Sequence, residues 1–79
     1  MFSPNEEKIL KIVGRRKSIT ITELTEKFYG TSELSMNAGI IVASAVRNIN
    51  RKCKHHKLDW FLNSVGTGRT GKTVWLDKQ

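Results

Sequence analysis

The sequence has few of the features that stabilise small secreted domains or hold a chain in a membrane. Its 79 residues include one cysteine, Cys53, which has no partner for an internal disulfide. No apolar run approaches the ~20 residues that a membrane-spanning helix requires, and residues 1–4 do not have the pattern of a secretory leader. We therefore expect a cytoplasmic protein that has no membrane contact.

The length also excludes several classes of protein. A chain of 79 residues forms one domain whose single core buries roughly 60% of the unfolded surface. A two-domain enzyme, a sensor joined to an output module and a large internal substrate cavity are all excluded. Without an internal disulfide, a small hydrophobic core must hold the fold together unless a partner contributes.

Acidic side chains are scarce in the second half of the chain. Lys and Arg number 14 against 7 Asp and Glu, and the formal net charge is +7. Residues 1–35 hold six basic and five acidic side chains, whereas residues 36–79 hold eight basic and two acidic ones, so that the two halves carry +1 and +6. Because a solvated surface usually mixes both signs, the second half predicts a surface that faces a polyanion. Charge alone leaves DNA, RNA and anionic lipid open.

The first helix is expected over about residues 4–13. Ser3 supplies the N-cap, Pro4 the first helical position and Glu6 the acid of a capping box. Gly14 is expected to adopt the left-handed conformation that ends many helices.

A short strand and a second helix are expected next. Residues 18–21 are β-prone and brief, and the helix over about 21–29 has Thr20 or Thr22 as its N-cap. Gly30 follows the helix and closes it.

The third helix, expected over about 38–55, has two different faces. At 100° per residue, one stripe is apolar; it holds Ala38, Val42, Ala45, Val46, Ile49 and Cys53. The opposite stripe is mostly cationic or hydroxylic; it holds Ile40, Ser44, Arg47, Arg51, Lys54 and His55. Asn48 and Asn50 fall on the two flanks. The pattern predicts that one stripe packs and the other faces solvent or a ligand.

The end of the chain predicts a β-hairpin over about 58–77 with a glycine-rich, basic tip. Residues 66–73 also match the P-loop pattern G-x-x-x-x-G-K-[ST]. A P-loop needs a helix directly after the motif, whose N-terminal amides bind phosphate, whereas residues 74–76 favour a strand. We therefore interpret the glycines as turn residues and expect neither nucleotide hydrolysis nor a cofactor.

No catalytic or metal site is predicted elsewhere. On a helix Cys53 points toward the packed stripe and His55 away from it, so these two and His56 do not converge on a metal ion. Glu6 and Glu23 are accounted for by helix caps, and no acid–base pair stands out. We expect a protein that is not an enzyme.

The two tryptophans leave two interpretations open. Trp60 and Trp75 lie in the predicted hairpin strands, where a small domain needs large aromatic side chains for packing. If either is exposed, base stacking on RNA or a single strand is the alternative.

Three helices followed by a hairpin with a basic tip resemble the winged helix-turn-helix family. The segments 21–24, 28–30 and 46–52, followed by strand, glycine-rich turn and strand, are similar to the DNA-binding domains of two-component response regulators. They are also similar to small winged-helix proteins of bacteria and their phages. The likeness covers about residues 5–77. It implies an α+β fold, a small winged helix of three helices, a short strand and a C-terminal hairpin wing, as one domain over 1–79.

The resemblance implies double-stranded DNA as the partner and a role in transcription regulation or as a phage or bacterial DNA-associated factor. It also implies a location on the nucleoid or in the cytoplasm of a host cell. In such domains the third helix enters the major groove and the wing contacts the minor groove or the backbone. By position, the helix contacts would come from Ser44, Arg47, Asn48 and Arg51, and the wing contacts from Arg69 and Lys72. Arg47 can pair with guanine and Asn48 with adenine. Arg51, Lys54, Arg69 and Lys72 would mostly neutralise phosphate or reach into a narrow minor groove.

Two departures from the family keep alternatives open. Response-regulator domains usually carry polar residues where this helix has Ile40 and Ile41, and we expect no receiver domain. Ile40 can contact a thymine methyl group or a partner, or be an isolated apolar residue. A winged-helix module that binds a host or viral protein, or a homodimer formed through both isoleucines, is the first alternative. RNA binding is the second.

Overall fold

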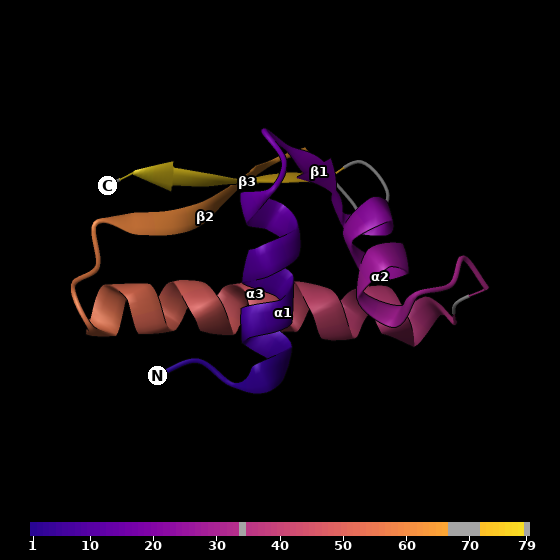
Figure 1. The fold of residues 1–79 in the computed structure, drawn as a ribbon, viewed down its shortest axis with the longest axis horizontal. Helices are drawn as coiled ribbons and strands as arrows, with labels where there is room; N and C mark the ends of the chain where they lie inside the picture. The colour runs from indigo at the N-terminus through magenta and orange to yellow at the C-terminus, as the bar shows by residue number, and fades with distance from the viewer. Residues whose placement is uncertain (34, 67–71, 79) are drawn as a thin grey trace.

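The computed structural model describes residues 1–33, 35–66 and 72–78. In chain order these residues form α1 (Pro4–Gly14), β1 (Ile19–Thr20), α2 (Ile21–Tyr29), α3 (Met36–His55), β2 (Trp60–Val65) and β3 (Thr73–Lys78). The strands make one antiparallel sheet in the order β1-β3-β2. The expected α+β class with three helices and a C-terminal hairpin is confirmed, and the short strand completes the sheet (Figure 1).

Helix α1 begins as expected and ends differently. The Ser3 hydroxyl accepts from the Glu6 N–H at 3.2 Å, and the Glu6 carboxylate accepts from the Ser3 N–H at 2.8 Å, which is a complete capping box. The prediction that Gly14 is left-handed was wrong. The backbone N–H groups of Arg15 and Arg16 instead bond back to the carbonyls three residues earlier, and this tightened last turn ends the helix without a left-handed residue.

Helix α2 is bounded by its predicted caps. The Thr20 hydroxyl accepts from the Glu23 N–H at 3.1 Å. At the other end Gly30 has φ 75°, and its N–H donates to the Glu26 carbonyl at 2.8 Å. The left-handed conformation is the one that glycine adopts without steric cost. The connection between α2 and α3 is therefore redirected at Gly30.

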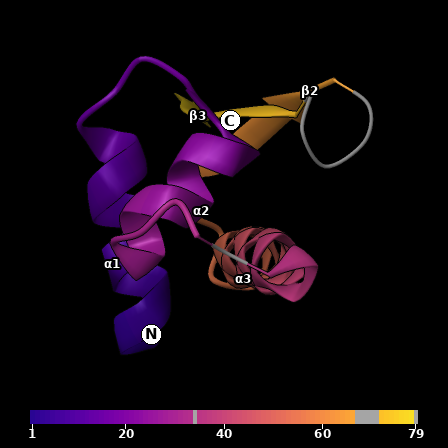
Figure 2. The same ribbon diagram turned by 90° about the vertical axis from the view of Figure 1, so that its right-hand side faces the viewer.

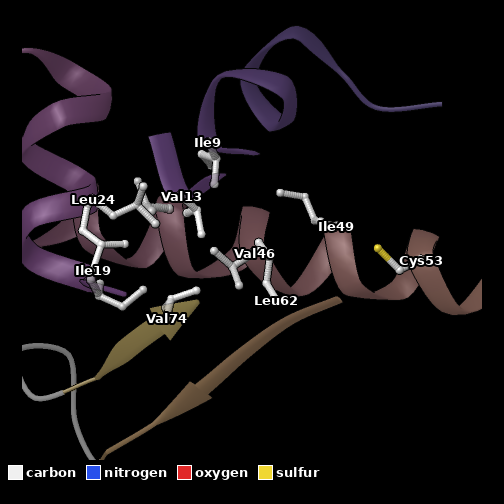
Figure 3. Close-up of a cluster of buried hydrophobic side chains, with 11 residues drawn as sticks. Ile9, Val13, Ile19, Leu24, Val46, Ile49, Cys53, Leu62 and Val74 are labelled. Carbon is white, nitrogen blue, oxygen red and sulfur yellow. The ribbon is translucent and has the colours of Figure 1, made fainter. Parts of the chain in front are cut away.

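One core joins all three helices to the sheet. Figure 3 shows Ile9 and Val13 of α1, Leu24 of α2, Ile49 of α3 and Leu62 of β2 pointing toward one another, and all five are buried. The apolar stripe of α3 contributes most of its members to this core, as expected; its buried residues are Ala38, Val42, Val46, Ile49 and Cys53. This packing fixes which side of α3 remains outside.

Two polar contacts fix α3 further. The Asn50 side-chain amide donates to the Leu62 carbonyl and accepts from the Leu62 N–H, each at 2.7 Å. Because β2 lies at an edge of the sheet, this amide takes the place of a neighbouring strand. On the other flank, the Lys52 ammonium lies 2.6 Å from a Glu6 carboxylate oxygen on α1. Both flanks of α3 are therefore tied to other elements.

Within the described ranges, no helix combines the length and apolarity needed to cross a membrane.

Candidate nucleic-acid interface

The side of α3 that faces away from the core carries a continuous row of side chains. We call Ile40, Ser44, Arg47, Arg51 and Lys54 the outward row; they recur every three or four residues, and so share one helix face. Ser44 is half-buried and the other four are exposed. Figure 2 looks along α3 and shows the sheet above it and α1 and α2 to one side, while the remaining side faces no other described element.

Asn48 lies on a flank, beside the outward row. It is exposed, and it precedes Lys52 by four residues, so the two share one face of the helix. Lys52 contacts Glu6 of α1, which places Asn48 on the α1 side. The structure thus brings Ser44, Arg47, Arg51 and Lys54 onto one face, with Asn48 at its border.

Like most cations among the described residues, those of the outward row have no acidic partner; Arg16 and Lys52 are the exceptions. In the part of the chain that the structure describes, two ion pairs form: Arg16 with Glu23 at 3.0 Å, and Lys52 with Glu6. Arg47, Arg51 and Lys54 belong to neither pair, and α3 contains no Asp or Glu. Like charges four residues apart on a helix repel each other. The row is therefore a concentrated positive surface without internal neutralisation.

The helix dipole explains only part of this charge. The negative end of a helix attracts cations, but the effect is confined to the last turn. Lys52 and Lys54 lie in that turn and gain this stabilisation. Arg47 and Arg51 lie before it. These two arginines have neither a dipole nor an acidic side chain to account for them within the described residues.

Lys52, which contacts the buried carboxylate of Glu6, is a cation with a structural role in the same protein. Glu6 is 6% exposed. Burial alone would raise the pKa of its carboxyl group, but the hydrogen bonds from Lys52 and from the Ser3 N–H, with the attraction to the Lys52 charge, hold that pKa below its ordinary value. Lys52 therefore holds two elements together, and its charge is satisfied inside the protein.

The hairpin supplies one further predicted contact residue to the described structure. Lys72 is half-buried directly before β3, and its carbonyl accepts from the Ile21 N–H at 2.9 Å, which fixes its backbone beside the start of α2. Arg69 lies outside the described residues. Residues 73–78 form a strand, so the helix that a P-loop requires does not follow the motif.

One exposed cation near this surface was not predicted. Lys57 follows α3, has φ 54° and donates its N–H to the Lys54 carbonyl at 3.2 Å. Its side chain is exposed. The sequence signal was only its position, directly after a basic helix. Lys57 adds an exposed positive charge beside the C-terminal end of α3.

The remaining candidate residues form no chemical site. Cys53 is buried in the core, and burial raises the pKa of its thiol. His55 and His56 are exposed, and their rings pack edge to face with 5.0 Å between the ring centroids. Among the described residues, no group of three His, Cys, Asp or Glu side chains is placed to hold a metal ion.

The tryptophans occupy the two faces of the hairpin. Trp60 packs against the core and lies 5.8 Å from the Phe2 ring. Trp75 alternates with buried Val74 along β3 and so points to the opposite face, where it is half-buried. Neither lies on the α3 side that carries the outward row.

Comparison of the chain with known proteins finds no matching family model, no matching curated protein and no matching solved structure.

Proposed function

We propose that this protein is a winged-helix protein that binds double-stranded DNA, with α3 in the major groove and the β2–β3 hairpin as the wing. The observation that carries the proposal is the pair Arg47 and Arg51. Both are exposed on the unpacked side of α3, in line with Lys54 and without an acidic partner in the described residues. DNA phosphates are an anion array that such a row can neutralise.

The order of the elements supports the same proposal. Helix, strand, two helices and a hairpin, with the sheet order β1-β3-β2, is the arrangement expected of a winged helix. Helix α3 has 20 residues and a length of about 30 Å. The major groove, about 12 Å wide, admits one helix. The exposed side of α3 is the side that would enter the groove.

The two halves of α3 suit different parts of the duplex. Positions 36–46 carry no charge, while every charged residue of the helix lies at 47–54. In helix-turn-helix proteins the N-terminal residues of the recognition helix contact base edges. We therefore assign phosphate contacts chiefly to Arg51, Lys54 and the wing lysine Lys72, while Arg47 and Asn48 lie where they can also reach guanine or adenine.

Fluorescence anisotropy with labelled duplex DNA over a series of salt concentrations tests this function. Four or five phosphate contacts predict a log–log slope of affinity against salt of about −4, from ~0.9 per contact. The double variant Arg47→Ala/Arg51→Ala should reduce the magnitude of this slope by about 2 and weaken binding on any sequence. Affinity that does not respond to salt would reject the proposal.

A charge-matched variant makes the test specific. Arg15→Ala/Lys17→Ala removes the same two charges from the turn between α1 and β1, which lies on the far side of the molecule from α3 (Figures 1 and 2). We expect this variant to keep the wild-type slope to within a few tenths. Equal losses in both double variants would show that net charge, and not the outward row, attracts DNA.

A protein partner is the second candidate function, because two large apolar side chains of α3 are exposed. Ile40 is 46% and Ile41 55% exposed, and exposed apolar groups can mark interaction sites. Under this alternative, Ile40→Ala and Ile41→Ala would leave duplex binding unchanged and abolish capture of the partner. Recovery of nucleic acid alone from a cell extract, lost after nuclease treatment, would argue against it.

A further inference from the structure

We propose that Ile40 recognises thymine, by placing its side chain against the C5-methyl group of one or two thymines in the major groove. This inference rests on the proposed function, because it assumes that α3 enters that groove. It goes further by naming the base that the protein prefers and the residue that selects it.

The position of Ile40 in the outward row carries the argument. Ile40, Arg47 and Arg51 share one helix face, with Ile40 about 10 Å from Arg47 along the axis at 1.5 Å per residue. If the arginines face DNA, Ile40 faces it too. It also lies in the N-terminal half of α3, where a recognition helix contacts base edges.

The chemistry of the major groove then restricts what Ile40 can select. Base edges in this groove present hydrogen-bond donors and acceptors, and their single apolar group is the thymine methyl. An isoleucine set against an amino or carbonyl group would remove that group from water without offering it a hydrogen bond. Against a thymine methyl, the same side chain removes apolar surface from water on both sides.

Among the described residues, Ile40 has no packing role that would explain its identity. It is 46% exposed and does not belong to the core or to the partly buried residues that pack against it. Ala38 and Val42, its neighbours at two residues on either side, already provide the packing of this part of α3. Alanine is also a better helix former than isoleucine. The protein therefore keeps a large apolar group on its cationic side where stability does not require one.

The adjacent residue Ile41 provides the matched comparison. It is equally apolar and 55% exposed, but it lies 100° further around the helix. It precedes Lys52 by eleven residues and Asn48 by seven, so it belongs to the flank that faces α1. A thymine contact from the outward row involves Ile40 and not Ile41.

The experiment compares thymine with deoxyuridine, which differs only by the methyl group. A binding site is first selected from randomised duplexes, and affinity is then measured by anisotropy with each thymine in turn replaced by deoxyuridine. We expect replacement at one or two positions to weaken wild-type binding about fourfold each, the value for loss of one buried methyl group. Ile40→Ala should bind the thymine and deoxyuridine duplexes equally. Ile41→Ala should keep the wild-type preference.

The possible outcomes distinguish failure of the thymine assignment from failure of the proposed function. If the wild-type protein does not bind duplex DNA, the proposed function fails. If it binds but does not distinguish thymine from deoxyuridine, or if Ile40→Ala keeps the distinction, the thymine assignment alone is overturned. Loss of the preference in both isoleucine variants would also overturn it, because a general disturbance of α3 would then be the cause. Thermal unfolding of both variants by circular dichroism verifies that they are folded.

Discussion

The flanks of α3 and its outward row both carry cations, but in opposite situations. On the flanks, Asn50 is bonded to the Leu62 backbone and Lys52 to Glu6. On the outward row, Arg47 and Arg51 have no acidic partner in the described residues. A cation is therefore structural on the flank and has no acidic partner among the described residues on the outward row. The role is decided by the direction that the packed stripe imposes, and not by residue type.

The largest expected effect comes from removing a flank contact. Asn50→Ala leaves the N–H and carbonyl of buried Leu62 without their partners, and we expect the free energy of unfolding to fall by about 2–3 kcal/mol. Urea denaturation measures it. Asn48→Ala, on the exposed side of the same helix, should change stability by less than ~0.5 kcal/mol. Equal losses for the two variants would contradict the structural role of Asn50.

In a DNA-binding experiment we expect the opposite ranking of the two asparagines, with the larger effect from replacing Asn48. Asn48 borders the outward row, whereas Asn50 faces β2. If Asn48 contacts adenine, Asn48→Ala relaxes the preference at one base pair by about 1–3 kcal/mol. Asn50→Ala, measured under conditions in which the variant is fully folded, should keep that base preference. A loss of base preference in Asn50→Ala alone would show that the two roles were assigned the wrong way round.

The contrast between the flanks and the outward row also shows which features of α3 could be predicted from the sequence. The packed and outward stripes of α3 follow from its helical period, because a period is local information. The task of Asn50 does not follow, since its partner is the backbone of a residue twelve positions away, and a backbone group has no side-chain signature. Likewise, Glu6 was identified as a capping acid from its spacing to Ser3, but its contact with Lys52 spans 46 residues and depends on how α1 crosses α3.

The wrong prediction for Gly14 has a similar origin. Gly14 is a plausible left-handed stop by residue type, yet α1 ends through hydrogen bonds of Arg15 and Arg16 in a tightened turn. At Gly30, where the same rule was applied, the glycine is left-handed. The difference lies in the route of the following chain: residues 15–18 lead to β1, which must pair with β3. Such a constraint arises only in the folded protein.

A smaller effect is expected from the pH dependence of the Glu6–Lys52 contact. Because the pKa of Glu6 is lowered in the folded state, its ionised form stabilises the protein above the ordinary glutamate pKa of about 4.5, and this contribution is lost as pH falls from there through the lowered pKa. Glu6→Gln should cost about 1 kcal/mol at pH 7, and the difference from wild type should shrink below about pH 4.5. Denaturation at several pH values measures it.

Two features of the chain make the pH experiment specific. The hydrogen bond from Asn63, followed by that from the Lys78 backbone, lowers the pKa of Asp77 as well, so the wild-type pH profile alone does not isolate Glu6. The difference between wild type and Glu6→Gln does. Glu7→Gln removes the same charge from an exposed position in the same turn of α1, and should cost no more than about 0.5 kcal/mol. A difference for Glu6→Gln that stays constant from pH 7 to pH 3 would contradict the role given to its charge.

The smallest expected effect comes from comparing two lysines of the same helical turn, Lys54 on the outward row and Lys52 on a flank. Lys54→Gln removes a cation of the outward row, and we expect it to reduce the magnitude of the salt slope of DNA binding by about 0.9. Its stability should change by less than ~0.5 kcal/mol. Lys52→Gln removes a cation whose charge is already satisfied by Glu6; it should lower stability by about 1 kcal/mol and leave the slope unchanged. If both variants lower the slope equally, the two sides of α3 do not differ toward DNA, and the division between structural and binding cations is wrong.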